Sequence, residues 1–319
     1  MIRPVSVLIA LGCAAALTGC GGSTDSSTGG SGATTTTSTS TTTTSNSAPS
    51  ETLEALWRAE GEDVAIVPGT NDYGPGKNRV SFLVVDKESK LIETAQARVW
   101  ISHGLKEKPF AQTIATLEPI GVPGGAEADA QNIYVATLDM PKPGKYWILA
   151  EPIGGSKKIQ ALGNAVVLRH SAAPEIGEKA IPSKNPVLAP GVDPKTVTTA
   201  EPPDRDLLRT TIAAAMAAKR PFVVAFATPL YCQTRTCGPV VQVVQSVAKD
   251  WQARGVDFIH VEIYKDNDPA KGTNRWVDEW KLRSEPFTFV VDRNGVIRSR
   301  FEGAFSAAEL QKAVGRVAS

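Results

Sequence analysis

The stretch Phe222-Val-Val-Ala-Phe-Ala-Thr-Pro-Leu-Tyr-Cys-Gln-Thr-Arg-Thr-Cys-Gly-Pro-Val-Val241 joins an apolar run to a valine-rich segment through a loop with two cysteines. The apolar run predicts a buried strand, and the segment after the loop has the periodicity of a helix. Cys232 and Cys237 are the thiols expected to remain available in the mature protein. Any chemistry of this chain is therefore expected to be thiol chemistry.

Strands and helices alternate on both sides of this stretch. The order predicts an α/β domain with a mixed sheet. Asn294-Gly295 supplies the positive φ that a tight hairpin between the last two strands needs. The expected elements are a helix over 204–219, strands over 222–228 and 256–264, helices over 239–253 and 275–281, strands over 287–291 and 296–301, and a helix over 306–317.

Two motifs in this order resemble the thioredoxin superfamily, over about residues 204–319. Cys237-Gly238-Pro239 opens a helix after a strand, and Glu285-Pro286 precedes the hairpin strand. The resemblance implies a thioredoxin-like α/β fold in which Pro286 has a cis peptide bond and lies across from the thiols. At two positions this chain departs from the pattern of the family. The usual second cysteine falls on Val240, and the usual buried acid falls on Ala225.

Cys237 is the predicted nucleophile. It lies in the first turn of a helix, where backbone N–H groups and the helix dipole favour an anion, and Arg235 adds positive charge. Both effects are expected to lower the pKa of its thiol. Cys232, five residues earlier, is the predicted resolving partner in a Cys-x4-Cys pair. The alternative is that the two cysteines form an inert structural disulfide.

Glu285 and Pro286 complete the predicted site. The Glu285 carboxylate is a candidate replacement for the missing acid, and the alternative is a solvated loop glutamate. Trp276 and Trp280, four residues apart on an expected helix, either flank the site or belong to the core.

A copper-handling function is the least favoured alternative. Copper chaperones with the thioredoxin fold combine two cysteines with a distant histidine. The histidines here are His103, His170 and His260. Only His260 falls within residues 204–319, inside an apolar strand where a structural role is expected. Two cysteines without a placed third ligand make a poor site, so neither a metal nor another cofactor is predicted.

The amino terminus predicts export. Arg3 precedes an apolar run, Val5–Leu17, that is shorter than the roughly 20 residues a membrane-spanning helix needs. The ending Leu17-Thr-Gly-Cys20 resembles a bacterial lipoprotein signal, which implies acylation of Cys20. Residues 1–20 are therefore predicted to be a signal peptide, and the mature chain an extracytoplasmic protein anchored to a bacterial membrane.

Composition changes three times after Cys20. Residues 21–50 are dominated by Ser, Thr and Gly and predict a disordered tether. Residues 51–170 show short alternating runs separated by Gly and Pro turns, and they predict an all-β, immunoglobulin-like sandwich. Residues 171–203 are proline-rich and predict a linker.

The expected function is thiol-disulfide exchange with the thiols or disulfides of exported proteins. The competing hypothesis is a non-catalytic adaptor lipoprotein in which the cysteine pair is structural. The chain has 34 basic and 33 acidic residues and a formal charge of +1, without a basic block. Nucleic acid is therefore not an expected partner.

Overall fold

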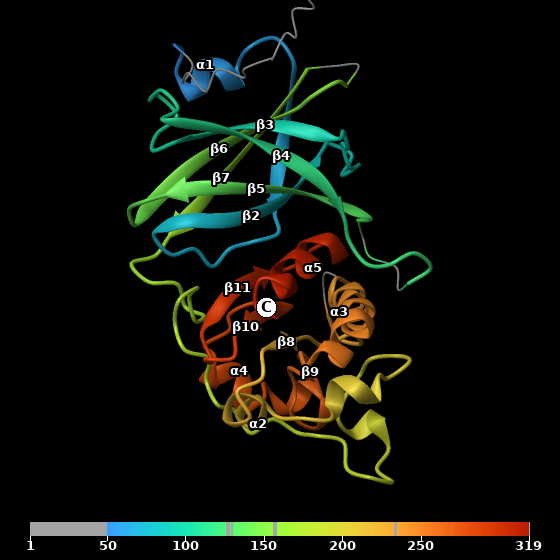
Figure 1. The fold of residues 1–319 in the computed structure, drawn as a ribbon. Helices are drawn as coiled ribbons and strands as arrows, with labels where there is room; N and C mark the ends of the chain where they lie inside the picture. Colours follow the sequence, from blue (N-terminus) through green and yellow to red (C-terminus); the bar gives the residue numbers. More distant parts are fainter. Residues whose placement is uncertain (1–49, 126–127, 129, 156–157, 233–234, 319) are drawn as a thin grey trace, which may run out of the picture. The chain divides into compact units, whose positions relative to one another are not determined.

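Seven strands form a closed barrel in the amino-terminal part of the described chain (Figure 1). The computed structural model describes residues 50–318 except 126–127, 129, 156–157 and 233–234. The barrel order is β1-β2-β5-β4-β3-β6-β7. Its strands are β1 (Glu62–Pro68), β2 (Gly76–Val85), β3 (Gln96–Ser102), β4 (Ala111–Pro119), β5 (Asn132–Met140), β6 (Gly144–Pro152) and β7 (Ile159–Val167).

The first strand closes the barrel. β1 pairs with β2 in antiparallel fashion and with β7 in parallel fashion. β2 and β7 would otherwise be the two edges of the sheet, and β1 covers both of them along the paired residues. Alternate side chains fill the interior, among them Phe82, Val99, Tyr134 and Tyr146. The predicted immunoglobulin-like sandwich is therefore wrong. Runs of alternating apolar and polar residues are equally typical of sandwiches and barrels. The β1–β7 pairing distinguishes the barrel from a sandwich, and it joins strands that are far apart in sequence.

A short helix, α1 (Leu53–Trp57), covers part of the outer barrel surface. Thr52 caps it by accepting a hydrogen bond from the Ala55 backbone. Leu53 packs with Trp100 and Leu149, which point outward from β3 and β6. This contact keeps three large apolar side chains out of water.

The second sheet has four strands in the order β11-β10-β8-β9. β8 and β9 are parallel, whereas β10 is antiparallel to both of its neighbours. The strands are β8 (Phe222–Phe226), β9 (Asp257–Val261), β10 (Phe287–Val291) and β11 (Ile297–Glu302). The helices around it are α2 (Ile212–Ala217), α3 (Cys237–Trp251), α4 (Arg275–Glu279) and α5 (Ala307–Gly315). Short 3-10 turns cover Pro194–Thr196, Arg205–Leu208, Gln252–Arg254, Lys265–Asn267 and Pro269–Lys271.

β8 is buried on both faces, which explains its uninterrupted apolar sequence. Val223 and Ala225 point to the side covered by α3 and α5. Phe222, Val224 and Phe226 point to the opposite side. The cysteine loop leaves the carboxyl end of this rigid central strand.

The predicted fold class is also wrong for residues 204–319. In the described residues, the helices are too few and too short for the predicted α/β thioredoxin-like fold. The expected helix over 204–219 is a 3-10 turn followed by the six-residue α2. The expected helix over 275–281 shrinks to the five residues of α4. In the described chain only α3 and α5 are longer than six residues. The spacing of apolar residues predicted these helices but not where they end. Lys219 and Lys281 follow the two helices and adopt positive φ, which does not continue a right-handed helix.

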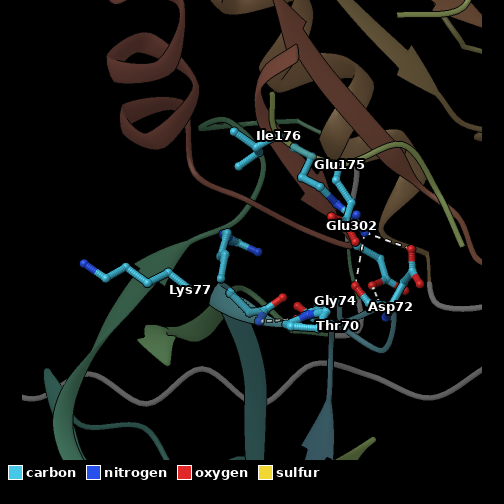
Figure 2. A pocket seen from close by; sticks show the side chains of 11 residues that line it. Thr70, Asp72, Gly74, Lys77, Glu175, Ile176 and Glu302 are labelled. Carbon is cyan, nitrogen blue, oxygen red and sulfur yellow. Dashed lines mark hydrogen bonds and ion pairs between the residues drawn. The ribbon is translucent and has the colours of Figure 1, made fainter. Parts of the chain in front are cut away.

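A buried ion pair joins the barrel to the second sheet. Arg300 on β11 donates to the Asp72 carboxylate at 2.9 Å, and Asp72 also accepts backbone N–H bonds from Ala172 and Ala173. Burial alone would raise the pKa of Asp72, but these two bonds and the Arg300 charge lower it below its usual value. Glu302 lies beside Asp72 in the same polar cavity, whereas the amine end of Lys77 extends away from both (Figure 2).

Replacing Asp72 with Ala is expected to reduce the free energy of unfolding by about 3–5 kcal/mol at pH 7, because the buried Arg300 charge loses its partner. Since the Asp72 pKa is lowered by folding, its contribution should vanish as the pH falls below its ordinary value of 3.8 and through the folded value. Urea unfolding at pH 7 and pH 3 measures both effects. Glu54→Ala, which removes an exposed pair with Arg58, is the control and should cost less than about 1 kcal/mol.

Candidate functional site

Helix α3 begins at Cys237, and its first backbone N–H points at the other cysteine. The Cys237 N–H donates to Cys232 Sγ at 3.4 Å. The Cys232 N–H is held in turn by the Thr228 carbonyl oxygen at 3.0 Å. Both cysteines are thiols in this structure. The structure thus brings together the two predicted residues, and the sulfur that receives the helix N–H belongs to Cys232.

Cys237 does not have the lowered pKa that its helix position predicted. Its side chain is fully buried, whereas Cys232 is 8% exposed. Burial, a hydrogen bond with Cys232 and the nearby Cys232 charge raise the pKa of the Cys237 thiol far above its ordinary value, although a hydrogen bond from the Thr228 backbone opposes them. The prediction is wrong because the helix N–H acts on the neighbouring sulfur, and desolvation dominates at Cys237 itself.

Glu285 lies at the thiols, as predicted. A carboxylate oxygen of Glu285 and the two cysteine sulfurs all lie within 4.8 Å of one another. Its Oε2 atom is buried and makes no hydrogen bond to the part of the chain that the structure describes. Burial, the Cys232 charge and the Glu262 charge raise the pKa of Glu285 to about 7. A carboxyl group with this pKa can exchange a proton with a thiol near neutral pH.

Pro286 has the predicted cis peptide bond to Glu285. Its carbonyl oxygen accepts the Gly303 N–H at 2.9 Å, just beyond β11. The preceding Ser284 donates its hydroxyl to Glu302 at 2.5 Å. Glu302 accepts two further N–H bonds from Asn71 and Asp72 of the barrel. The segment 284–286 is therefore fixed from both the second sheet and the barrel.

An open cavity of about 320 Å³ exposes the Cys232 side of the site. We call it the thiol pocket; it is lined by Cys232, Ile263, Tyr264, Val277, Leu282 and Glu285. Cys237 is absent from its described lining. A molecule entering from this side therefore meets the Cys232 sulfur before that of Cys237.

Two further residues at this site were missed from the sequence. Glu262 is buried directly after β9, and one of its oxygens accepts both the N–H and the hydroxyl of Thr199. Tyr264 lies on the wall of the thiol pocket, and burial followed by the Glu285 and Cys232 charges raises the pKa of its hydroxyl. The available signal was an acid at the end of the apolar strand Phe258-Ile-His-Val-Glu262. Thr199 also accepts the Leu230 N–H at 3.3 Å, so the proline-rich segment supports the cysteine loop.

The remaining candidates lie away from the thiols. Trp280 is fully buried among Phe226 and Phe289, which makes it a core residue. Trp276 packs at the edge of the same cluster. His260 has the structural role that was predicted, with one ring nitrogen on Thr198 Oγ1 and the other on the Ala227 carbonyl oxygen.

The three converging side chains also form a donor set for a metal ion. Two sulfurs and a carboxylate oxygen within 4.8 Å suit a soft or borderline cation, and thiolates favour Cu(I) and zinc. Glu285 is thus a candidate for the third ligand that the sequence did not place. His103, one of the three candidate histidines, instead stacks on Phe110 and Tyr146 of the barrel.

The predicted signal peptide, Cys20 and the predicted tether up to residue 49 lie outside the described residues. Within the described part of the chain, none of the helices combines the length and apolar character needed to cross a bilayer.

Comparisons with known proteins give distant structural matches. No family model matches the chain, and no curated protein matches it. A thiol:disulfide interchange protein of the thioredoxin family from Chlorobium tepidum TLS is 15% identical over 34% of this chain and 86% of its own, with a TM-score of 0.25. A second Chlorobium tepidum structure, whose description names the thiol:disulfide interchange protein DsbE, is 17% identical over 32% of this chain and 84% of its own, also at 0.25.

A third match is the multi-modular chitinase ChiW from Paenibacillus sp. str. FPU-7. It is 13% identical over 34% of this chain and has a TM-score of 0.20. The match covers only 9% of the chitinase. At these identities and TM-scores, the matches assign neither a fold nor an activity to the chain.

Proposed function

We propose that this chain is a thiol-disulfide oxidoreductase that acts on exported proteins through Cys232 and Cys237, and that acylated Cys20 anchors it to a bacterial membrane outside the cytoplasm. The observation that carries the activity is the convergence of two thiols and the Glu285 carboxyl group at the start of α3. The amino-terminal sequence alone supports the location and the anchor.

Cys232 is the attacking thiol in this mechanism, which reverses the roles expected from the sequence. Its sulfur accepts the first N–H of α3, lines the thiol pocket and is less buried than that of Cys237. The helix N-terminus favours the thiolate at this position. Glu285 accepts the Cys232 proton. The Cys232 thiolate then attacks one sulfur of a client disulfide, and the other client sulfur leaves as a thiolate.

The mixed disulfide gives Cys237 a target within 4.8 Å, the Cys232 sulfur. Once Cys232 is bonded to the client it carries no charge, so two of the smaller causes that raise the Cys237 pKa disappear, while burial remains. Glu285, after losing its first proton to the leaving thiolate or to solvent, accepts the Cys237 proton. The Cys237 thiolate attacks Cys232 Sγ, the client leaves as a dithiol, and the pair is oxidised to a disulfide. The same steps in reverse oxidise a client.

Exchange with a small chromogenic disulfide, such as an aryl disulfide that releases a coloured thiolate, tests this function. The reduced protein should release the coloured thiolate and become a Cys232–Cys237 disulfide, as measured by absorbance and by the loss of two protein thiols. A protein that reacts no faster than free cysteine would support the non-catalytic adaptor instead.

Soft-metal binding is a second candidate, favoured by the Cys232, Cys237 and Glu285 donor set. If it holds, the reduced protein should bind one equivalent of Cu(I) under anaerobic conditions. Cys232→Ser should abolish this stoichiometry, and Glu285→Gln should weaken affinity roughly tenfold or more. Competition with a Cu(I) chelator measures both effects. An affinity unchanged by either substitution would rule out this site.

A further inference from the structure

A second cavity lies beside the thiol site on the barrel side. It measures about 400 Å³. We call it the barrel pocket; its wall includes Val67, Leu83, Ile120, Ile133, Glu285 and Ala304. Ser284 and Glu285 line both this pocket and the thiol pocket. The mechanism above uses no residue of the barrel, so this wall has no role in it.

We propose that the barrel pocket binds a large apolar side chain next to the cysteine of the client, so that the barrel selects the clients of the thiol site. This inference rests on the proposed function, because it takes a cysteine-bearing segment as the occupant. Reaction at Cys232 requires the client sulfur to lie beside Glu285, whose carboxylate is within 4.8 Å of Cys232 Sγ. An extended chain advances about 3.3 Å per residue, so a side chain in the barrel pocket belongs to a residue within about two positions of that cysteine.

The lining of the barrel pocket favours an uncharged apolar group. The barrel contributes aliphatic side chains, and the charged groups in the described lining are the carboxylates of Glu285 and Glu302. Glu302 is already engaged by Asn71, Asp72 and Ser284. An acidic client side chain would meet two carboxyl groups without a cation. At about 400 Å³, the cavity is at the small end of ligand pockets, which suits one large side chain.

Close backbone packing holds the pocket in place. Gly69 at the end of β1 and Gly303 at the end of β11 both line it. Gly303 has a φ of +72°, and a Cβ there would collide with the Gly69 carbonyl oxygen. A Cβ at Gly69 would lie 2.9 Å from the Ile133 side chain. The two glycines therefore allow the chain just after β1 and the chain just after β11 to pack closely at one side of the pocket.

Two large apolar side chains are also exposed on the cysteine loop. Leu230 is 67% exposed and Tyr231 is 38% exposed, immediately before Cys232. The Tyr231 ring packs edge-on against Tyr264 of the thiol pocket, with centroids 6.1 Å apart. Exposed large apolar side chains beside a reactive group mark a contact surface for an apolar partner.

Peptide disulfides test the selectivity. Each peptide carries one cysteine in a mixed disulfide with a chromogenic thiol, and Phe, Ala or Asp stands one or two residues before or after it. For at least one position, kcat/KM with Phe should exceed that with Asp by about tenfold or more, mainly through KM, because only the Phe side chain gains from burial against the apolar wall. Val67→Asp, on a side chain that is 42% exposed, should abolish the preference.

The controls separate the two proposals. Val166→Asp makes the same change at a 52% exposed position of β7 outside the pocket, and it should keep the Phe preference. A chromogenic disulfide without a peptide should react equally with all three proteins. Absence of exchange with any substrate would overturn the proposed function itself. Normal exchange without a Phe preference at any position, or with a preference that survives Val67→Asp, would overturn the barrel pocket as the selecting site.

Discussion

The Cys237→Ser protein is expected to accumulate stable mixed disulfides with its clients, whereas the Cys232→Ser protein forms none. Removing Cys237 leaves the attacking sulfur of Cys232 in the thiol pocket but removes the thiol that releases the client. Removing Cys232 leaves Cys237 fully buried and outside the described lining of the thiol pocket, so a client sulfur has no access to it. Multiple turnover should fall by roughly a thousandfold or more in both proteins, because neither can complete the cycle.

Non-reducing electrophoresis and mass spectrometry of the trapped species measure this difference. A protein lacking both cysteines gives the background, including any reaction at an unacylated Cys20. Trapping by Cys232→Ser and not by Cys237→Ser would restore the roles expected from sequence, with Cys237 as nucleophile. Trapping by neither would favour the adaptor with a structural cysteine pair.

The sequence identified the members of this site but not their roles. Cys232, Cys237, Glu285 and Pro286 were all named from local motifs, and the structure brings the two sulfurs and the Glu285 carboxylate together. Which sulfur receives the helix N–H depends on how the loop turns back from Thr228, a feature that residue spacing does not contain. The desolvation that raises the pKa of Cys237 could not be predicted either, because it comes from side chains that are distant in sequence.

As for the site, the features of the fold that depend on neighbouring residues were predicted, and those that depend on residues distant in sequence were not. Most strands were located from apolar runs, and β8 was predicted as a buried strand from its uninterrupted apolar sequence. The barrel depended on one parallel pairing between β1 and β7, about a hundred residues apart, and the sequence offers no signal for it. The barrel pocket was missed as well, because it combines Val67 and other barrel residues with the distant segments 284–285 and 302–304.

Glu285→Gln should slow the release of the client from the mixed disulfide by about 10²–10⁴-fold at neutral pH, since the Cys237 proton loses its acceptor. Only the ionised carboxylate can accept a proton, so the wild-type release rate should rise with pH through the Glu285 pKa, which burial and the Glu262 charge still raise although the bonded Cys232 carries no charge. The Gln variant should lose this inflection. A stopped-flow jump from pH 5 to a series of higher pH values, starting from a chromogenic mixed disulfide on Cys232, isolates this step.

Glu262→Gln is the matched control, because it changes the neighbouring buried acid instead. The carbonyl oxygen of Gln can still accept the Thr199 hydrogen bonds, and the loss of the Glu262 charge removes one cause of the raised Glu285 pKa. The inflection should therefore move to lower pH while the plateau rate at high pH is retained. A Glu285→Gln protein with an unchanged inflection would show that another group takes the Cys237 proton. An inflection unmoved in Glu262→Gln but lost in Glu285→Gln would keep Glu285 as the base and assign its raised pKa to burial.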